Sequence, residues 1–293
     1  MHTATLSDRV TIVVLTNNRC AELCRSLNHL IALAEQPGII VVDNGSTDNT
    51  AHCISNAFPK TKLIRSERNL GAAGRNLGVD HVHTPYVAFS DDDTWWAPGA
   101  LSLGADLLDR HPHIAVLNAR IVVGREARLD PACAVMANSP LDCVAGVGPL
   151  LTGFMAGAII MRKNAFVQAG GYWDAFHIGG EEALLAMDIM DAGGQIAYAP
   201  ALQVHHWPSQ KRDAKLRRRL LARNAMWTAW LRLPPQLAWR QTHRILKQLP
   251  QWNLRGWVIA ATLCRAHAIW MRRRVLSEDV CRSLERVWRY ESR

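Results

Sequence analysis

The chain has 293 residues, of which 49% are hydrophobic and 20% are charged, and its formal net charge is +9. This composition is that of a globular protein and excludes a disordered or fibrous chain. The charge is unevenly spread, because residues 1–200 carry 14 basic and 20 acidic groups whereas residues 201–293 carry 20 and 5. Eight of the eleven tryptophans also lie beyond residue 200. We therefore expect a mildly acidic body followed by a basic, tryptophan-rich extension.

The cysteines and the apolar segments indicate the compartment. The seven cysteines are an odd number without paired Cys-x-x-Cys spacing, which argues against a zinc site or a disulfide scaffold and suits a reducing environment. Cys20 and Cys24 are expected to share a helix face as ordinary packing. The N-terminal residues have no signal-peptide character. The uncharged segment 143–161 contains Pro149 and four glycines, so we predict a loop and a strand there, no transmembrane helix, and a cytoplasmic protein.

The first 90 residues alternate between apolar strands and helical segments, as a parallel sheet requires. Strands are predicted at 10–15, 39–42, 62–64 and 86–89. Helices are predicted at 20–33, from Ser46 or Thr47 to about Phe58, and from Gly71 onward. Polar residues follow the first, second and fourth strands, at the edge where open α/β sheets bind ligands.

The pattern continues beyond the fourth strand. A helix is predicted at 98–109, strands at 114–123 and 154–161, and an irregular insertion at 124–148. Gly-Gly pairs at 170–171 and 179–180 predict a mobile loop, and a helix is predicted to start at Glu181. The predicted fold is α/β, with a mixed, mostly parallel sheet flanked by helices in residues 1–207 and a helical extension in residues 208–293.

Three consecutive aspartates, Asp91, Asp92 and Asp93, follow the fourth predicted strand. Like charges repel one another, so folding alone gives no reason for them. At the carboxyl end of a buried strand they suit a hard-cation site that holds a phosphorylated ligand. A solvated acidic turn is the alternative for such a triplet in isolation.

Four other features are candidates for chemistry. Asp43 ends the second strand and suits a base N–H or a ribose hydroxyl, or equally an Asx turn. The glycine-rich start of the helix at Gly71 suits close approach to a phosphate or sugar, which is weak evidence by itself. Glu181 and Glu182 suit a general base, or a response to the helix dipole. The pair at 205–206 ends a late strand, where adjacent side chains point opposite ways and one histidine can ligate a metal.

Taken in order, these motifs resemble the family 2 inverting glycosyltransferases of the GT-A (Rossmann-like) type. The resemblance runs through residues 8–207 and rests on an ordered set of segments: 10–19, 41–48, 69–78, 89–93 with 98–99, 180–182, 196–200 and His205. It implies a nucleotide-diphosphate-sugar donor and Mg²⁺ or Mn²⁺ as cofactor. The implied donor-binding residues are Thr16, Asn18, Arg19, Asp43, Gly71, Arg75, Asn76, Asp91 and Asp92.

The resemblance also implies roles around the reacting atoms. Asp91 and Asp93 would be the outer residues of a DxD motif and ligands of the metal, with Asp93 the main ligand and His205 or His206 completing the metal site. Glu182 falls on the usual base position, although the family usually has Glu-Asp where this chain has two glutamates. Trp173 and Glu181 would lie on the acceptor side, and the acceptor would be a lipid-linked glycan or a surface polysaccharide precursor. A sugar-phosphate nucleotidyltransferase and a non-catalytic carbohydrate- or nucleotide-binding protein are the alternatives.

The extension mixes arginine with tryptophan on predicted helices that Pro234-Pro235 interrupts. One helix is predicted to run through Lys211, Arg212 and Arg223 to Trp230. This composition is typical of helices at a membrane interface, so we expect peripheral contact with an anionic inner membrane surface. An appendage packed on the body or in a homo-oligomer is the alternative. Nucleic acid fits the charge but leaves the sugar-transfer residues without a purpose.

Overall fold

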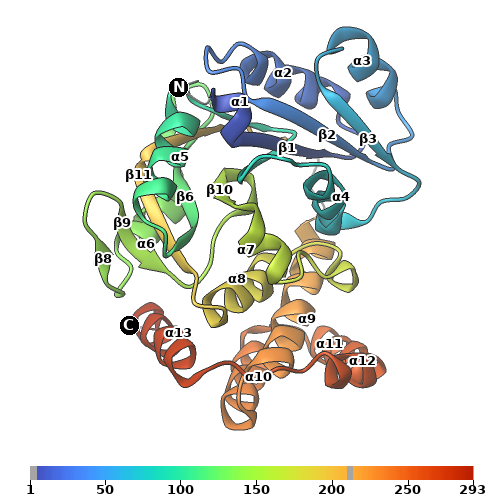
Figure 1. The fold of residues 1–293 in the computed structure, drawn as a ribbon. Coiled ribbons are helices and arrows are strands. Elements are labelled where there is room, and N and C mark those ends of the chain that lie inside the picture. Colours follow the sequence, from blue (N-terminus) through green and yellow to red (C-terminus); the bar gives the residue numbers. More distant parts are fainter. Residues whose placement is uncertain (1–4, 210–213, 293) are drawn as a thin grey trace.

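The computed structural model describes residues 5–209 and 214–292, and a single large sheet organises its first two thirds (Figure 1). Four strands at one side are parallel to one another in the order β3 (Lys62–Ser66), β2 (Gly38–Asn44), β1 (Val10–Thr16) and β4 (Tyr86–Asp91). Strand β10 (Ile159–Arg162) is antiparallel to β4 and to β6 (Ile114–Val123), and β11 (Gln195–His206) is parallel to β6. The predicted mixed, mostly parallel sheet is therefore confirmed.

Short strands complete the sheet at its edges. They are β9 (Gly148–Leu151), β8 (Cys143–Val144), β7 (Arg128–Leu129) and β5 (Thr94–Trp96). Strand β5 pairs antiparallel with the end of β11, which brings Thr94 opposite His206. This pairing folds the chain back directly after the aspartate triplet and positions the end of β11 beside it.

Helices cover the sheet. The predicted ones are α2 (Cys20–Ile31), α3 (Thr50–Ala57), α4 (Gly74–Asp80), α5 (Ala100–Arg110) and α8 (Glu181–Asp191). Two short helices, α1 (Leu6–Arg9) and α7 (Lys163–Gln168), are not predicted from the sequence. Leu23, Leu27 and Leu30 of α2 are fully buried at helical spacing, so this face packs on the core. At Gly78 a side chain would overlap Val13 of β1, which shows how closely α4 lies on the sheet.

Two sequence-based expectations for the middle of the chain were wrong. The insertion at 124–148 is ordered rather than irregular, since it holds β7, β8 and helix α6 (Pro131–Ala137). Asp130 caps α6 by accepting from the Ala132 N–H at 2.9 Å, with Pro131 at the first helical position, a start signal that the prediction missed. The strand predicted at 154–161 begins only at Ile159, after a 3₁₀ turn at Ala156–Ala158.

The extension is helical, as predicted. Its helices are α9 (Ala214–Arg232), α10 (Pro235–Gln248), α11 (Trp252–Cys264), α12 (Ala266–Met271) and α13 (Glu278–Glu291). The break at Pro234-Pro235 is confirmed, whereas the predicted basic residues Lys211 and Arg212 lie outside the described residues. In the described ranges, 5–209 and 214–292, none of the helices is both long and apolar enough to cross a membrane.

The extension packs against the body through buried clusters and ion pairs. Phe176 and Leu184 of the body share a cluster with Trp227 of α9. Asp188 on α8 forms ion pairs with Arg232 at 2.5 Å and with Arg274 at 2.9 Å. Figure 1 shows the extension beneath the sheet, next to α7 and α8. The division of the chain at residue 207 stays a prediction.

Candidate functional site

The middle aspartate of the triplet ties two loops together. Asp92 is buried, and its carboxylate accepts from Thr16 Oγ1 and Arg19 Nη1, each at 3.1 Å. The Asp92 carbonyl accepts from Ser26 Oγ at 2.8 Å. Burial raises the pKa of Asp92 to about 7, against the opposing charge of Arg19. The Asp92 side chain therefore joins the loop after β1 to the aspartate triplet. These hydrogen bonds support the turn that the triplet forms.

The third aspartate faces the end of β11. Asp93 Oδ1 lies 3.6 Å from Nε2 of His206, and Asp93 Oδ2 accepts from the Ser209 N–H at 3.2 Å. Arg19 Nη1 is 3.7 Å from the same carboxylate. The backbone carbonyl of Asp93 accepts from the Trp207 N–H at 2.8 Å, which extends the β5–β11 pairing by one step. The structure thus brings Asp93, His206 and Arg19 together.

The two histidines of the late strand have different surroundings, as their alternation requires. His205 stacks on Trp95 with ring centroids 5.5 Å apart, and Trp95 stacks on His29 at 4.3 Å. Burial lowers the pKa of His205, and His29 adds to this. Since the prediction left either histidine open, the structure favours His206 as the partner of Asp93.

The first aspartate turns toward the glycine-rich helix. Asp91 forms an ion pair with Arg75, whose guanidinium also lies over the Phe89 ring at 5.7 Å. Arg75 is buried, while the Asp91 side chain is 44% exposed. In the described part of the chain, Arg75 Nε has no hydrogen-bond partner. Buried N–H groups in proteins usually have a hydrogen-bond partner. The Arg75 N–H without one, next to the exposed Asp91 carboxylate, therefore marks a polar site.

Asp93 and His206 together fit a hard divalent cation. They offer a carboxylate oxygen and an imidazole nitrogen 3.6 Å apart. Mg²⁺ in enzymes is commonly held by only one or two carboxylates plus phosphate oxygens of the substrate, so a small protein ligand set is sufficient. Among residues 5–209 and 214–292, the triplet and His206 do not supply three ligand atoms that all lie within 4.8 Å of one another.

The two glutamates begin α8 and are electrostatically linked to Arg75. Glu181 is 5% exposed, and its Oε2 has no hydrogen-bond partner among the described residues. Burial raises the pKa of Glu181 to about 7, and the charge of Glu182 adds to this. Glu182 is partly exposed, and burial raises its pKa, while the charges of Arg75 and Arg217 oppose the rise. Arg75 interacts with Asp91 and both glutamates, so it connects the triplet to the acid pair.

The glycine-rich segment holds the loop before α8. Gly71 has φ of +62°, and a Cβ there would overlap the His177 carbonyl, which accepts from the Ala72 N–H at 2.6 Å. Asn76 Nδ2 donates to the Tyr172 carbonyl at 2.8 Å, and Asn76 Oδ1 accepts from the Tyr172 N–H at 3.0 Å. Gly71 and Asn76 thus contact loop 170–180, and their predicted donor contacts stay predictions.

The extension supplies two residues that sequence reasoning missed. Asn224 of α9 is fully buried and donates from Nδ2 to carbonyls of the same loop, those of Phe176, Ile178 and Gly179. Arg223 Nη2 donates to the Phe176 carbonyl at 2.9 Å. The basic run around these positions suits a membrane surface or an appendage packed on the body, and nothing in the sequence singles out these two residues.

Trp173 lies at the junction between body and extension. Its ring centroid is 5.9 Å from that of Trp227 and 5.4 Å from that of Phe176, and the Arg272 guanidinium lies over the Trp173 ring at 5.1 Å. The Trp173 ring thus contacts Phe176 of loop 170–180 and two residues of the extension, Trp227 and Arg272. Its predicted contact with an acceptor stays a prediction.

The loops after β1 and β2 are also joined. Asp43 is fully buried and accepts from the Ser46 N–H at 2.9 Å, the predicted Asx turn, and from Arg65 Nε at 3.1 Å. Asn18 Oδ1 accepts from the backbone N–H groups of Thr47 and Asp48 at 2.8 and 3.2 Å. Whether Asp43 also binds a base or ribose stays a prediction.

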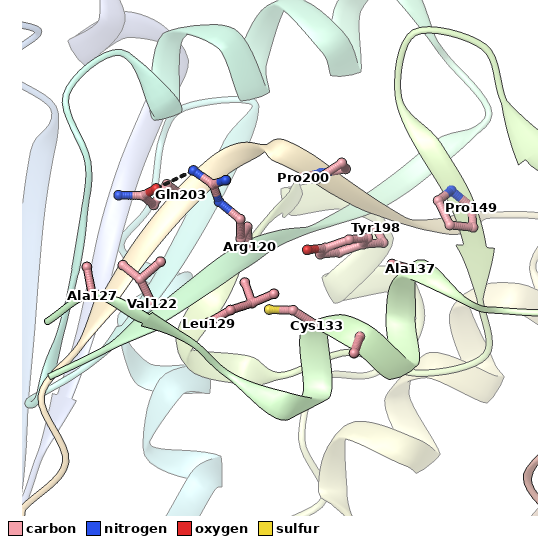
Figure 2. Close-up of a pocket in the computed structure, with 11 residues that line it drawn as sticks. Arg120, Val122, Ala127, Leu129, Cys133, Ala137, Pro149, Tyr198, Pro200 and Gln203 are labelled. Atoms are coloured by element: carbon pink, nitrogen blue, oxygen red, sulfur yellow. Dashed lines mark hydrogen bonds between the residues drawn. The ribbon is translucent and has the colours of Figure 1, made fainter.

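An apolar groove of about 690 Å³ lies elsewhere, between β11, β6, α6 and β9 (Figure 2). Tyr198, Pro149 and Cys133 line it, together with Arg120, which donates to Gln203 at 2.5 Å. Its lining, drawn from the described residues, includes neither the aspartate triplet nor the glutamate pair. The ordered insertion at 124–148 thus forms a groove that is separate from the acidic cluster.

Known proteins are similar to this chain in sequence and in fold. The family model for glycosyl transferase family 2 matches residues 11–166. A pre-mycofactocin glycosyltransferase of Mycobacterium tuberculosis (strain CDC 1551 / Oshkosh) is 31% identical over 219 residues, covering 70% of this chain and 44% of that protein. An N-acetylglucosaminyl-diphospho-decaprenol L-rhamnosyltransferase of the same strain is 24% identical over 238 residues, covering 69% of this chain and 76% of that protein.

A solved structure supports the fold. The mannosyltransferase PcManGT from Pyrobaculum calidifontis, in complex with GDP-Man and Mn²⁺, superposes with a TM-score of 0.60 at 18% identity, over 94% of this chain and 78% of that one. The chain spans less than half the length of the mycofactocin relative. The family match itself runs from β1 into α7, contains the aspartate triplet and covers more than half of the chain. The protein therefore belongs to glycosyl transferase family 2.

Proposed function

We propose that this protein transfers a hexosyl or deoxyhexosyl group from a nucleotide-diphosphate sugar to an acceptor hydroxyl, with inversion, in the synthesis of a cell-surface glycan or glycolipid. The proposal rests on one arrangement. Asp93, the last residue of the aspartate triplet, faces His206, and the charge of Arg75 links Asp91 of the same triplet to Glu181 and Glu182. The names of the two relatives, a pre-mycofactocin glycosyltransferase and an N-acetylglucosaminyl-diphospho-decaprenol L-rhamnosyltransferase, support this class of reaction. The GDP-Man and Mn²⁺ bound to the solved neighbour support it too.

The residues divide the chemistry between them. Asp93 and His206 would hold Mg²⁺ or Mn²⁺, which when bound neutralises charge on a departing diphosphate. Glu182, which is partly exposed at the start of α8, would remove the acceptor hydroxyl proton as that oxygen attacks the sugar carbon from the opposite face. A carboxylate whose pKa is raised toward the working pH is better matched to this proton transfer than an ordinary surface glutamate.

A thermal-shift experiment tests the donor site. UDP-, GDP- and dTDP-sugars are added with and without Mn²⁺ to the wild type, to Asp93→Asn and to Asp142→Asn, an exposed control. At least one donor is expected to raise Tm in a Mn²⁺-dependent way in the wild type and the control, and to lose that dependence in Asp93→Asn. Equal Mn²⁺-dependent shifts in all three proteins would refute the metal role of Asp93.

Product analysis separates the alternatives. A glycosyltransferase releases a nucleoside diphosphate from its donor, whereas a sugar-phosphate nucleotidyltransferase releases pyrophosphate from a nucleoside triphosphate. A non-catalytic binding protein shows the Tm shift and releases neither product. Release of pyrophosphate, or binding without turnover on a broad acceptor panel, would therefore count against sugar transfer.

We also propose that the extension contacts an anionic membrane surface. Trp252 and Trp270 are 83% and 74% exposed, and Leu263 and Met271 between and beside them are nearly as exposed. Arg255 lies over the Trp252 ring at 4.9 Å, which places a cation at the same face of α11. Exposed tryptophan with arginine suits insertion at the headgroup level of anionic lipid.

Vesicle co-sedimentation tests this contact. Phosphatidylserine-containing vesicles are expected to bind the protein at low salt and to release much of it at high salt. The double substitution Trp252→Ala/Trp270→Ala should reduce binding severalfold, while Trp239→Ala on α10, also exposed, serves as the matched control. Absence of binding even at low salt would favour packing of these tryptophans against a partner or a second copy.

A further inference from the structure

Three thiols that the proposed reaction does not use lie together between α2 and α3. The Sγ atoms of Cys20, Cys24 and Cys53 are all within 4.8 Å of one another, and those of Cys24 and Cys53 are 2.9 Å apart. All three side chains are partly exposed. Cys20 and Cys24 lie one turn apart on the face of α2 that meets α3, which supplies Cys53. The lack of paired Cys-x-x-Cys spacing argues against a zinc site, but the packing of α3 on α2 brings Cys53 to the other two thiols.

We propose that Cys20, Cys24 and Cys53 bind one thiophilic metal ion, Zn²⁺ or Cu⁺, through three thiolates. With metal–sulfur distances of about 2.3 Å, sulfur atoms around one such ion lie roughly 3.8 Å apart, within the span that these three already occupy. Cysteine sulfur selects soft metals of this kind over Mg²⁺ or Mn²⁺. Cys20 Sγ donates to the Asn49 carbonyl at 4.0 Å, so an oxygen atom also lies beside the cluster.

Metal binding replaces the protons of the thiols. Three thiols release three protons to solvent as three metal–sulfur bonds form.

The three cysteines lie near the starts of α2 and α3, the helices that follow the loops after β1 and β2. Cys20 directly follows Arg19, the last residue of the loop after β1, which donates a hydrogen bond to Asp92. In the loop after β2, the backbone N–H groups of Thr47 and Asp48 donate to Asn18. That second loop ends at Asn49, whose carbonyl accepts from Cys20 Sγ. A metal bound to both helices would cross-link the ends of these two loops, where α2 and α3 begin. We therefore expect metal loading to change the affinity for the sugar donor. This consequence rests on the proposed function. The proposed metal site is independent of that function.

Cobalt(II) is the probe. The full chain is reduced, stripped with a chelator and titrated with Co²⁺, and the near-ultraviolet thiolate-to-cobalt charge-transfer band is recorded. One equivalent is expected to give the band, and Zn²⁺ should displace it. Cys24→Ser and Cys53→Ser should each weaken Co²⁺ binding more than about 100-fold, since even changes in residues behind the ligands cost about 10- to 100-fold. Cys143→Ser and Cys264→Ser, at exposed cysteines outside the cluster, should bind normally.

The outcomes separate this site from the donor site. Asp93→Asn should keep the charge-transfer band whether or not sugar transfer is confirmed. An unchanged band in Cys53→Ser, with circular dichroism confirming that the variant is folded, would overturn the assignment. So would a wild type that binds no Co²⁺ or Zn²⁺ under reducing conditions, or one whose Cys24 and Cys53 are found by peptide mass mapping to be disulfide-linked after purification with reductant.

Discussion

Asn224 donates a hydrogen bond of 2.5 Å to the carbonyl of Gly179, across the boundary between the extension and the body. Gly179 is the second residue before Glu181, so this contact fixes the approach of the chain to the start of α8. Two more carbonyls, those of Phe176 and Ile178, accept from the same amide. The extension therefore acts as part of the scaffold of the acid pair, whatever its outer surface binds.

Removing this amide is expected to destabilise the protein. Asn224→Ala leaves the loop carbonyls without their donor, at a cost of about 2–4 kcal/mol in the free energy of unfolding, since an unpaired buried polar group costs about 1–3 kcal/mol. Urea unfolding measures the difference. Asn138→Ala, which removes an exposed asparagine bonded to the Ala134 carbonyl, is the control and should lose less than about 1 kcal/mol. Equal losses in the two variants would show that the loop does not depend on Asn224.

Gly71 should tolerate no side chain. Its φ of +62° resembles that of Gly146 at +75°, but a Cβ at Gly71 would overlap the His177 carbonyl whereas one at Gly146 would meet open space. Gly146→Ala is therefore expected to cost about 1 kcal/mol from backbone strain alone, and Gly71→Ala about 3 kcal/mol or more. Thermal unfolding of the pair measures both. Similar midpoints would mean that loop 170–180 moves aside freely.

The two glutamates are expected to differ in their effect on turnover. Glu182→Gln should lower kcat by about 10²- to 10⁴-fold, the usual contribution of a general base, while leaving the donor-induced Tm shift unchanged. Glu181→Gln should keep kcat within about tenfold, because the buried Glu181 side chain is less accessible to an acceptor hydroxyl than the partly exposed Glu182. Initial rates at saturating donor decide between them. The reverse ranking would move the base assignment to Glu181.

Stability should fall as the pH rises from about 4.5 to about 7. In the folded protein Glu181 and Asp92 keep their protons up to a pKa of about 7, whereas in the unfolded chain they release them near 4.5 and 3.8. The folded state binds more protons in this window, so deprotonation favours unfolding. Glu181→Gln should remove up to about 3 kcal/mol of this loss, at 1.36 kcal/mol per pKa unit.

Urea unfolding at about pH 5 and pH 8 checks this expectation. The wild type should be less stable at the higher pH, and Glu181→Gln should show a smaller difference. Glu126→Gln, which removes an exposed carboxyl, should behave like the wild type. A wild type that gains stability over this range would contradict the burial argument for Glu181.

Local patterns were sufficient for the framework of the fold. The apolar runs at β1, β2 and β4 predicted buried parallel strands, and the spacing of Leu23, Leu27 and Leu30 predicted the buried face of α2. The family followed from motifs in order along the chain and is confirmed by the match over residues 11–166. The ordered insertion was missed because Asp130-Pro131 starts a helix too short for its periodicity to stand out.

The sequence by itself determined the parallel core, the position of the acidic triplet at a strand end and the family, because strand and helix periodicities and short motifs are local properties of a chain. Only the tertiary structure decided which side chains meet. Strand alternation turned His206 toward Asp93 and His205 toward Trp95. Packing of α9 on the loop before α8 made Asn224 a structural partner of the site, and packing of α3 on α2 brought Cys53 to Cys24. Such contacts join residues remote in sequence, and their energies depend on burial that no local pattern contains.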